Sequence, residues 1–100
     1  MKTTAPQLLS QALAIQQERA AQYDQAGGER SAGKVAAMFN IAKGREVVTE
    51  ADVWLMLTIL KIVRGEANGP HADSCLDFVS YSSLYGEARL DQLNQPQETP

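Results

Sequence analysis

A chain of 100 residues fits one domain, and its 44% of hydrophobic residues is typical of a folded domain and not of a disordered chain. Its 12 Asp and Glu against 9 Lys and Arg give a net charge of -3, which argues against a nucleic-acid-binding surface, since such surfaces are basic. The single Cys and the single His exclude an internal disulfide, a four-cysteine zinc site and a zinc site built on several histidines.

The sequence indicates neither a signal peptide nor a membrane span. The N-terminus lacks a charged region followed by an apolar one, which a signal peptide requires. The longest apolar stretch, residues 53–60, contains Thr58 and is far shorter than the roughly 20 residues of a membrane helix. We therefore expect a cytoplasmic protein, and nothing in the composition calls for a cofactor.

The first predicted helix begins after Thr4 and runs to about Ala26. Thr4 is a suitable N-cap, Pro6 fits the first helical turn, and Gln7 stands where the partner residue of a capping box belongs. Gly27 and the glycine after it are typical of a helix end. The apolar stripe of this helix is narrow, so its Gln-rich remainder is expected to face solvent.

A shorter second helix is predicted from Ser31, a possible cap, to Lys43, with Gly44 ending it. Its apolar residues are dense. They are Val35, Ala36, Met38, Phe39, Ile41 and Ala42. The β-branched pair at 47–48 that follows is too short to predict a strand.

The clearest helix start in the chain is Thr49, because a threonine cap is followed by two acids, Glu50 and Asp52, that the helix dipole favours. From Val53 to Val63 the helix is apolar almost all round, a pattern typical of a helix buried on every side. A chain this short offers too few neighbours to cover it, so we expect a homodimer or a larger even oligomer through the third and fourth helices. The residues expected in the shared core are Trp54, Met56 and Ile59.

Pro70 can open the last helix, which is predicted to run to about Leu90. From Asp91 the chain is polar and contains two prolines, so residues 91–100 are expected to form a flexible tail. The sequence therefore predicts an all-α fold, a bundle of three long helices and one short helix, with a single helical domain over residues 1–90.

Two motifs resemble chemical sites, but the structural explanation is the stronger one for each. Residues 28–35 nearly spell a phosphate-binding loop, yet Val35 stands where a hydroxyl should hold magnesium, and a helix precedes the loop instead of a strand. His71 and Cys75 are four residues apart and could form a thiolate–imidazole pair, but no third orienting group is visible. We expect a tight interhelical turn and a structural cysteine, and hence no catalytic residue.

Asp73 and Asp77 lie on one face of the last predicted helix, since they are four residues apart, and Tyr81 continues that face. Two carboxylates so placed could bind a divalent cation or share a proton. They could instead pair with Lys61 and Arg64, which end the preceding helix and which a short turn would bring alongside. The opposite charges on the two helices favour structural ion pairs, so no metal site is expected here.

Charged residues and one tyrosine gather where the first predicted helix ends. A solvated helix end is the plainer explanation of this group. The alternative is a polar rim around an aromatic anchor, the arrangement that binds a partner protein. The residues expected to bind a partner are Glu18, Tyr23, Asp24, Glu29 and Arg30.

The stretch from residue 8 to residue 88 resembles a family of small phage and prophage domains. The matching pieces are Tyr23, residues 49–53, 60–64 and 71–74, Asp77 and Tyr81. That family is similar to the all-helical MazG-type nucleoside triphosphate pyrophosphohydrolases, which hold magnesium on an E-x-x-E pair and an E-x-x-D pair. The resemblance implies a helical fold and, in its enzymatic form, a magnesium-dependent hydrolase.

This chain departs from the carboxylate pattern of those enzymes. Asp77 can stand for the final aspartate, but the nearest upstream acid, Asp73, is four residues back and not three. Leu55 occupies the position three after Asp52, where the first pair would need an acid. Because a magnesium–triphosphate site needs several carboxylates, the resemblance supports the fold and not the activity.

The small size, the acidity and the phage character resemble anti-CRISPR proteins, especially those that inhibit type I-F systems. This resemblance implies a non-enzymatic inhibitor of host defence, in the host cytoplasm. It would bind Cas proteins of a type I crRNA-guided surveillance complex on their basic DNA-binding surface and so prevent the complex from binding DNA. Two alternatives remain: a MazG-like pyrophosphohydrolase, and a protein that sequesters a nucleotide signal with Lys61, Arg64 and Tyr81.

Overall fold

The computed structural model describes residues 2–24, 31–67 and 69–95. Helix α1 spans Ala5–Arg19 and continues as a single π-helical turn, η1, over Ala20–Asp24. Three further helices follow, and they are α2 (Ser31–Lys43), α3 (Glu50–Ala67) and α4 (Ala72–Asn94). The described residues contain no strand, which confirms the predicted all-α fold.

Two capping boxes fix the starts of α1 and α3, as their sequences predict. The Thr4 backbone N–H donates to Oε1 of Gln7 at 2.8 Å, and the Gln7 N–H donates to Oγ1 of Thr4 at 3.3 Å. At α3 the Thr49 N–H donates to Oδ2 of Asp52 at 2.9 Å, and the Asp52 N–H returns the bond to Oγ1 of Thr49 at 3.2 Å. Each box satisfies two donors that would otherwise lack partners at a helix start.

The connection from α2 to α3 is organised by Asn40. Helix α2 ends at Gly44, whose φ of 74° allows the chain to turn back, with the Arg45 N–H donating to the Asn40 carbonyl at 3.2 Å. The Asn40 side chain then accepts from the N–H groups of Val47 and Val48 and donates to the Val48 carbonyl, all at 2.8–3.0 Å. These bonds replace the strand partner that an extended segment would otherwise need, and so the two valines form no sheet.

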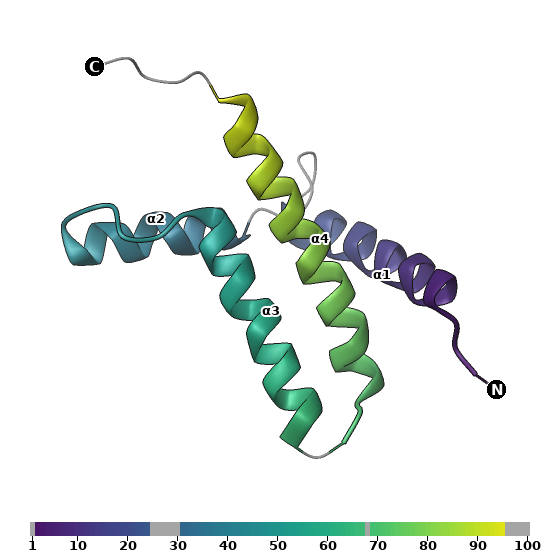
Figure 1. Ribbon diagram of the computed structural model, residues 1–100. Coiled ribbons are helices and arrows are strands. Elements are labelled where there is room, and N and C mark those ends of the chain that lie inside the picture. The colour runs from purple at the N-terminus through teal and green to yellow at the C-terminus, as the bar shows by residue number, and fades with distance from the viewer. Residues whose placement is uncertain (1, 25–30, 68, 96–100) are drawn as a thin grey trace.

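Helices α3 and α4 form an antiparallel hairpin, α1 lies against α4, and α2 projects sideways from the start of α3 (Figure 1). The core lies where the second half of α4 meets the start of α3 and the adjacent part of α2. Most of its buried residues are small, which allows the helix backbones to approach closely. They are Ala32, Ala36, Ala51, Val53, Trp54, Leu84 and Ala88.

Trp54 is the largest side chain in this core. It is 2% exposed, and its ring centroid lies 5.5 Å from that of Tyr81 on α4. The hydroxyl of Thr58, one turn further along α3, donates to the Trp54 carbonyl at 2.8 Å. Trp54 therefore belongs to the core of a single chain, and the prediction that a second chain covers it has to be corrected. Met56 and Ile59, its two companions in that prediction, are exposed.

Within one chain the third helix is not covered on every side, and whether a second chain covers the rest stays a prediction. One side of α3 packs on α4 and α2, while six large apolar side chains on its other side are 37–58% exposed. These are Leu55, Met56, Ile59, Leu60, Ile62 and Val63. A hairpin partner covers only one face of a helix, and no other described element reaches the opposite face.

Three helix ends differ from the sequence predictions. The first helix changes at Ala20 to π geometry instead of continuing as an α-helix, and its predicted end at Ala26 lies outside the described residues. Pro70 stays in the turn, next to Gly69 with φ 83°, so α4 begins two residues later. It also continues beyond Leu90 to Asn94, since no proline occurs before Pro96, and residues 91–94 are helical instead of forming a tail.

None of the described helices combines the length and the apolar content needed to cross a membrane.

Replacing Trp54 with Ala should lower the free energy of unfolding by about 3–5 kcal/mol, because it empties the largest buried site of the chain. Trp54→Phe is the matched control, since it keeps a ring against Tyr81, and it should cost much less. Urea unfolding followed by the helical circular dichroism signal measures both variants. Equal stability of Trp54→Ala and the parent chain would contradict the core described above.

Candidate functional site

The most buried charged residue among the described residues is Asp77 on α4, at 9% exposure. Its Oδ2 lies 2.9 Å from Nζ of Lys61 on α3, and its Oδ1 lies 3.1 Å from Nη2 of Arg19 on α1. One carboxylate thus joins three helices, with each oxygen held by a different cation. Part of the predicted set of structural ion pairs, Lys61 with Asp77, is present.

The two cations determine the charge state of Asp77. Burial of the carboxyl group raises its pKa, but hydrogen bonds and charge from Lys61, together with those from Arg19, outweigh burial and hold the pKa of Asp77 below its ordinary value. The carboxylate is therefore ionised at neutral pH, and it stabilises the fold as an acceptor of two charge-assisted hydrogen bonds.

The other predicted ion pair, between Arg64 and Asp73, does not form within the described part of the chain. Arg64 and Asp73 are both exposed, and no ion pair joins them there. The sequence reasoning instead missed Arg19, because the polar side of the first helix was assigned to solvent. The spacing of Ala12, Ile15 and Arg19 is a signal that could have placed Arg19 beside the buried face of α1.

A second polar contact fixes α1 on α4 next to this charged cluster. Nε2 of Gln16 donates to the Ser80 carbonyl at 3.1 Å and to Oγ of Ser83 at 2.7 Å. The Gln-rich side of α1 therefore faces α4 in part and is not wholly solvated. Arg19 and Gln16 together make the attachment of α1 polar, in contrast to the apolar core between α3 and the second half of α4.

This arrangement favours a structural role for the carboxylate face of α4 over metal binding. Both oxygens of Asp77 already accept from cations, and the described residues hold no group of three His, Cys, Asp or Glu close enough to share an ion. Lys61 is also engaged, since its Nζ lies 5.9 Å from the centroid of the Tyr81 ring. A nucleotide phosphate would have to compete with Asp77 for this ammonium group.

The phosphate-loop-like stretch and the His71–Cys75 pair belong, where they are described, to the starts of helices α2 and α4. Residues 28–30 lie outside the described residues, and the part of the phosphate-loop-like stretch from Ser31 onward forms the first turns of α2. A Cβ on Gly33 would lie 2.9 Å from Oε1 of Glu50, the far end of a flexible side chain that can move aside, so Gly33 lies beside the start of α3 without a strict need for glycine. His71 is the N-cap residue of α4, and the exposed Cys75 meets it through a backbone hydrogen bond at 3.0 Å.

The predicted partner-binding residues are only partly within the described structure. Glu18 is exposed on the last turn of α1. Tyr23 and Asp24 belong to η1, but their side chains lie outside the description, as do Glu29 and Arg30 entirely. The prediction that these residues form one surface therefore stays a prediction.

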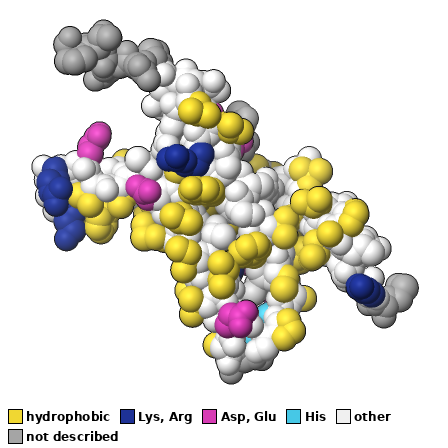
Figure 2. All heavy atoms as spheres, viewed as in Figure 1, with side chains coloured by type: hydrophobic (Ala, Val, Ile, Leu, Met, Phe, Trp, Pro, Cys, Tyr) yellow, Lys and Arg dark blue, Asp and Glu magenta, His cyan; other side chains and the backbone are white. Residues whose placement is uncertain are grey.

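Exposed apolar side chains lie along α2 and the part of α3 that borders it, and together they are here called the α2–α3 surface. They are Val35, Met38, Phe39, Val47, Met56, Ile59, Leu60 and Val63. A wholly apolar groove of about 440 Å³ connects the two helices. Its walls are Val35, Phe39, Val47, Val48, Val53, Met56 and Leu57. Figure 2 shows hydrophobic side chains following α3 along one face of the molecule, with charged groups confined mostly to its ends.

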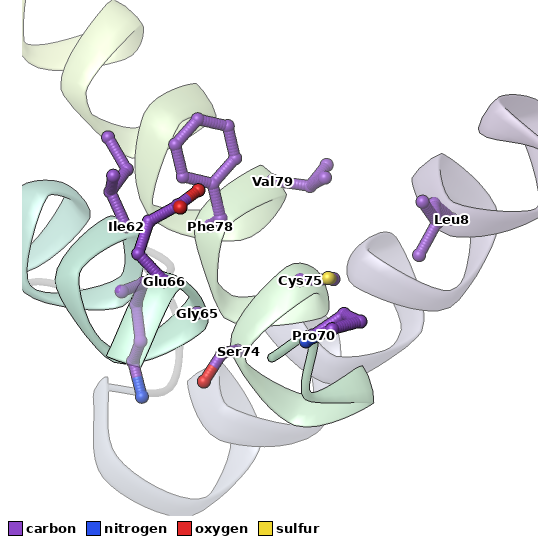
Figure 3. Close-up of a pocket in the computed structure, with 10 residues that line it drawn as sticks. Leu8, Ile62, Gly65, Glu66, Pro70, Ser74, Cys75, Phe78 and Val79 are labelled. Atoms are coloured by element: carbon purple, nitrogen blue, oxygen red, sulfur yellow. The ribbon is translucent and has the colours of Figure 1, made fainter. Parts of the chain in front are cut away.

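A second apolar cavity, of about 390 Å³, lies near the turn between α3 and α4 (Figure 3). Ile62 and Glu66 of α3 face Phe78 of α4 there, and the Cys75 sulfur turns toward Leu8 of α1. The polar side chains in this mostly apolar lining are Lys61, Glu66 and Ser74, and Lys61 is already paired with Asp77.

Residues 7–89 match a family described as a domain of unknown function (DUF6378). The matched segment runs from the first turn of α1 nearly to the end of α4, so it includes all the helices described above. No curated protein matches the chain, and no solved structure does either.

The charged cluster predicts how stability depends on pH. Because the pKa of Asp77 is lower in the folded chain than in the unfolded chain, its contribution is complete above the ordinary aspartate value of about 4 and is lost as pH falls through the folded value. Asp77→Asn should cost about 1–3 kcal/mol at neutral pH and flatten the decline of stability in acid. Urea unfolding over a pH series measures both effects.

Asp73→Asn is the matched control for this test, because Asp73 lies one turn earlier on the same helix and is exposed. This variant should have nearly the same free energy of unfolding as the parent at neutral pH, and its stability should fall in acid as steeply as that of the parent. An Asp77→Asn variant as stable as the parent at neutral pH would show that the cluster does not hold the helices together.

Proposed function

We propose that this chain, which belongs to the DUF6378 family of domains, works by binding other proteins and not by catalysing a reaction. The observation that carries the proposal is the α2–α3 surface, since monomeric proteins rarely expose contiguous apolar patches larger than a few hundred Å². The carboxylate that would serve a catalytic magnesium ion is instead enclosed by Lys61 and Arg19, which supports the same proposal.

The proposal has two parts, a homodimer and an inhibited partner. The exposed apolar residues of α3 support self-association, which the all-round apolar sequence of this helix also predicts. The partner is proposed from the resemblance to anti-CRISPR proteins: Cas proteins of a type I surveillance complex, contacted in the host cytoplasm. The net charge of -3 suits such a partner, because a DNA-binding surface is basic and opposite charges speed association.

The test of the inhibitor function is phage survival on a host that carries type I CRISPR immunity against that phage. Expression of the chain should restore plaque formation, and the purified chain should capture the surveillance complex and prevent it from binding target DNA. Absence of protection against every CRISPR type tested would contradict the anti-CRISPR form of the proposal.

The residues at the end of the first helix provide the matched variants. Reversing Asp24 and Glu29 to lysine should abolish protection, because removing one partner of a desolvated charge pair costs on the order of 2–5 kcal/mol of binding free energy. The exposed acid Asp91 on α4, reversed to lysine, is the control and should leave protection unchanged. If the double reversal protects phage as well as the parent, the partner binds elsewhere. Circular dichroism confirms that each variant is folded.

The enzymatic alternative is tested separately. The chain should release no pyrophosphate from nucleoside triphosphates with magnesium or manganese, because both oxygens of Asp77 are occupied by cationic side chains. Pyrophosphate release that Asp77→Ala abolishes would instead establish a MazG-like hydrolase and replace the inhibitor proposal.

A further inference from the structure

We infer that the α2–α3 surface binds the same surface of a second copy of this chain, so that the working unit is a symmetric pair joined at α3. This inference rests on the proposed protein-binding function and names the occupant of its apolar surface. It also changes the predicted interface, because the fourth helix covers the opposite face of α3 within one chain.

The exposed side of α3 has the pattern of a helix-pairing stripe. Met56, Ile59 and Val63 follow one another at intervals of three and four residues, the spacing with which helices pack against each other. Their exposed fractions are 53%, 48% and 58%. Lys61, the charged residue within this stretch, points to the other side of the helix and contacts Asp77. The stripe therefore offers apolar contact and no charge along its middle.

The exposed area of the whole chain leaves room for a dimer interface. The chain exposes 7494 Å², whereas a compact monomer of 10.9 kDa exposes about 5,600 Å². The excess over the whole chain is about 1,900 Å², and a standard interface of roughly 800 Å² per partner would need less than half of it. The radius of gyration of 15.4 Å likewise exceeds the value of about 13 Å for a compact domain of this length.

Two stretches outside the described helices are unsuited to cover the surface. Residues 25–30 read QAGGER and residues 96–100 read PQETP, so neither contains a large apolar side chain. A molecule that covers the surface needs an apolar face of its own.

A second copy fits that requirement because the surface is self-complementary. The groove of about 440 Å³ between α2 and α3 has Met56 in its wall, and the exposed Ile59 follows Met56 by three residues on the same helix. In a two-fold pair, the protruding residues of each copy can enter the groove of the other. The net charge of -3 on each copy is too small to oppose this contact strongly.

The acids at the ends of the stripe define how the two helices meet. Asp52 precedes the stripe and Glu66 follows it, so Ile59 lies midway between them. Helices aligned along their whole length would bring these acids of the two copies together, whether parallel or antiparallel. The two α3 helices therefore cross at an angle, with Ile59 of each copy at the two-fold axis.

Sedimentation velocity over a concentration series tests the inference. The parent chain should be a dimer at micromolar concentration, and the Met56→Glu and Ile59→Glu double variant should weaken the dimer at least thirtyfold, about the loss expected when a central interface anchor is removed. Leu93→Glu is the matched control, because Leu93 is 79% exposed on the last turn of α4, away from this surface. It should leave the dimer intact.

A cross-linking measurement on folded protein complements the charge variants. Ile59→Cys in a Cys75→Ser background carries a single thiol, and mild oxidation should convert it to a disulfide-linked dimer, whereas Leu93→Cys in that background should remain largely unlinked. A monomeric parent chain, or a dimer that the double variant does not weaken and Ile59→Cys does not link, would overturn the inference. Phage protection by a monomeric parent would overturn the pairing and leave the inhibitor part of the proposed function standing. A dimer that gives no protection would support the pairing and contradict the inhibitor part.

Discussion

The carboxylate of Asp77 holds the first, third and fourth helices in one arrangement. Its two oxygens accept from Lys61 of α3 and Arg19 of α1, and its own helix is α4. A partly buried carboxylate is unfavourable without partners, so the contact specifies where α1 lies as well as stabilising it. The Gln16 bonds to Ser80 and Ser83 extend the same polar seam. Helix α1 is thus positioned by directional contacts, while α3 and α4 are joined by apolar packing around Trp54.

The composition of the core explains why so much apolar surface stays outside. Four of the seven core residues are alanines, which let helices approach closely but remove little apolar area from water. The larger apolar residues of α2 and α3, such as Phe39 and Met56, stay 42% and 53% exposed, because they line a groove between the two helices that no other described helix covers. A single chain therefore satisfies its polar helix ends and its buried charge, yet leaves one apolar face for another molecule to cover.

The sequence predicts the helices well and their surroundings less well. Local signals, such as the Thr4 and Thr49 caps and the glycine after Lys43, act within a few residues, so they place helix starts and ends directly. Burial depends on neighbours distant in sequence. An apolar circumference on α3 cannot show whether its cover comes from the same chain, and a polar side on α1 hides Arg19 as a partner of Asp77. The predicted partner-binding residues at 23–30 rest on composition alone.

Helix α3 serves the core and the exterior with opposite faces, which separates folding from association. Trp54, Thr58 and Lys61 recur at intervals of three and four residues and contact α4 or its own backbone within the chain. Leu55, Ile59 and Ile62 follow the same spacing on the exposed face. A substitution on the first face changes the free energy of unfolding of each copy, whereas one on the second would change the free energy of the proposed pairing. Because a dimer also stabilises its folded subunits by mass action, thermal stability should rise with concentration only while the second face is intact.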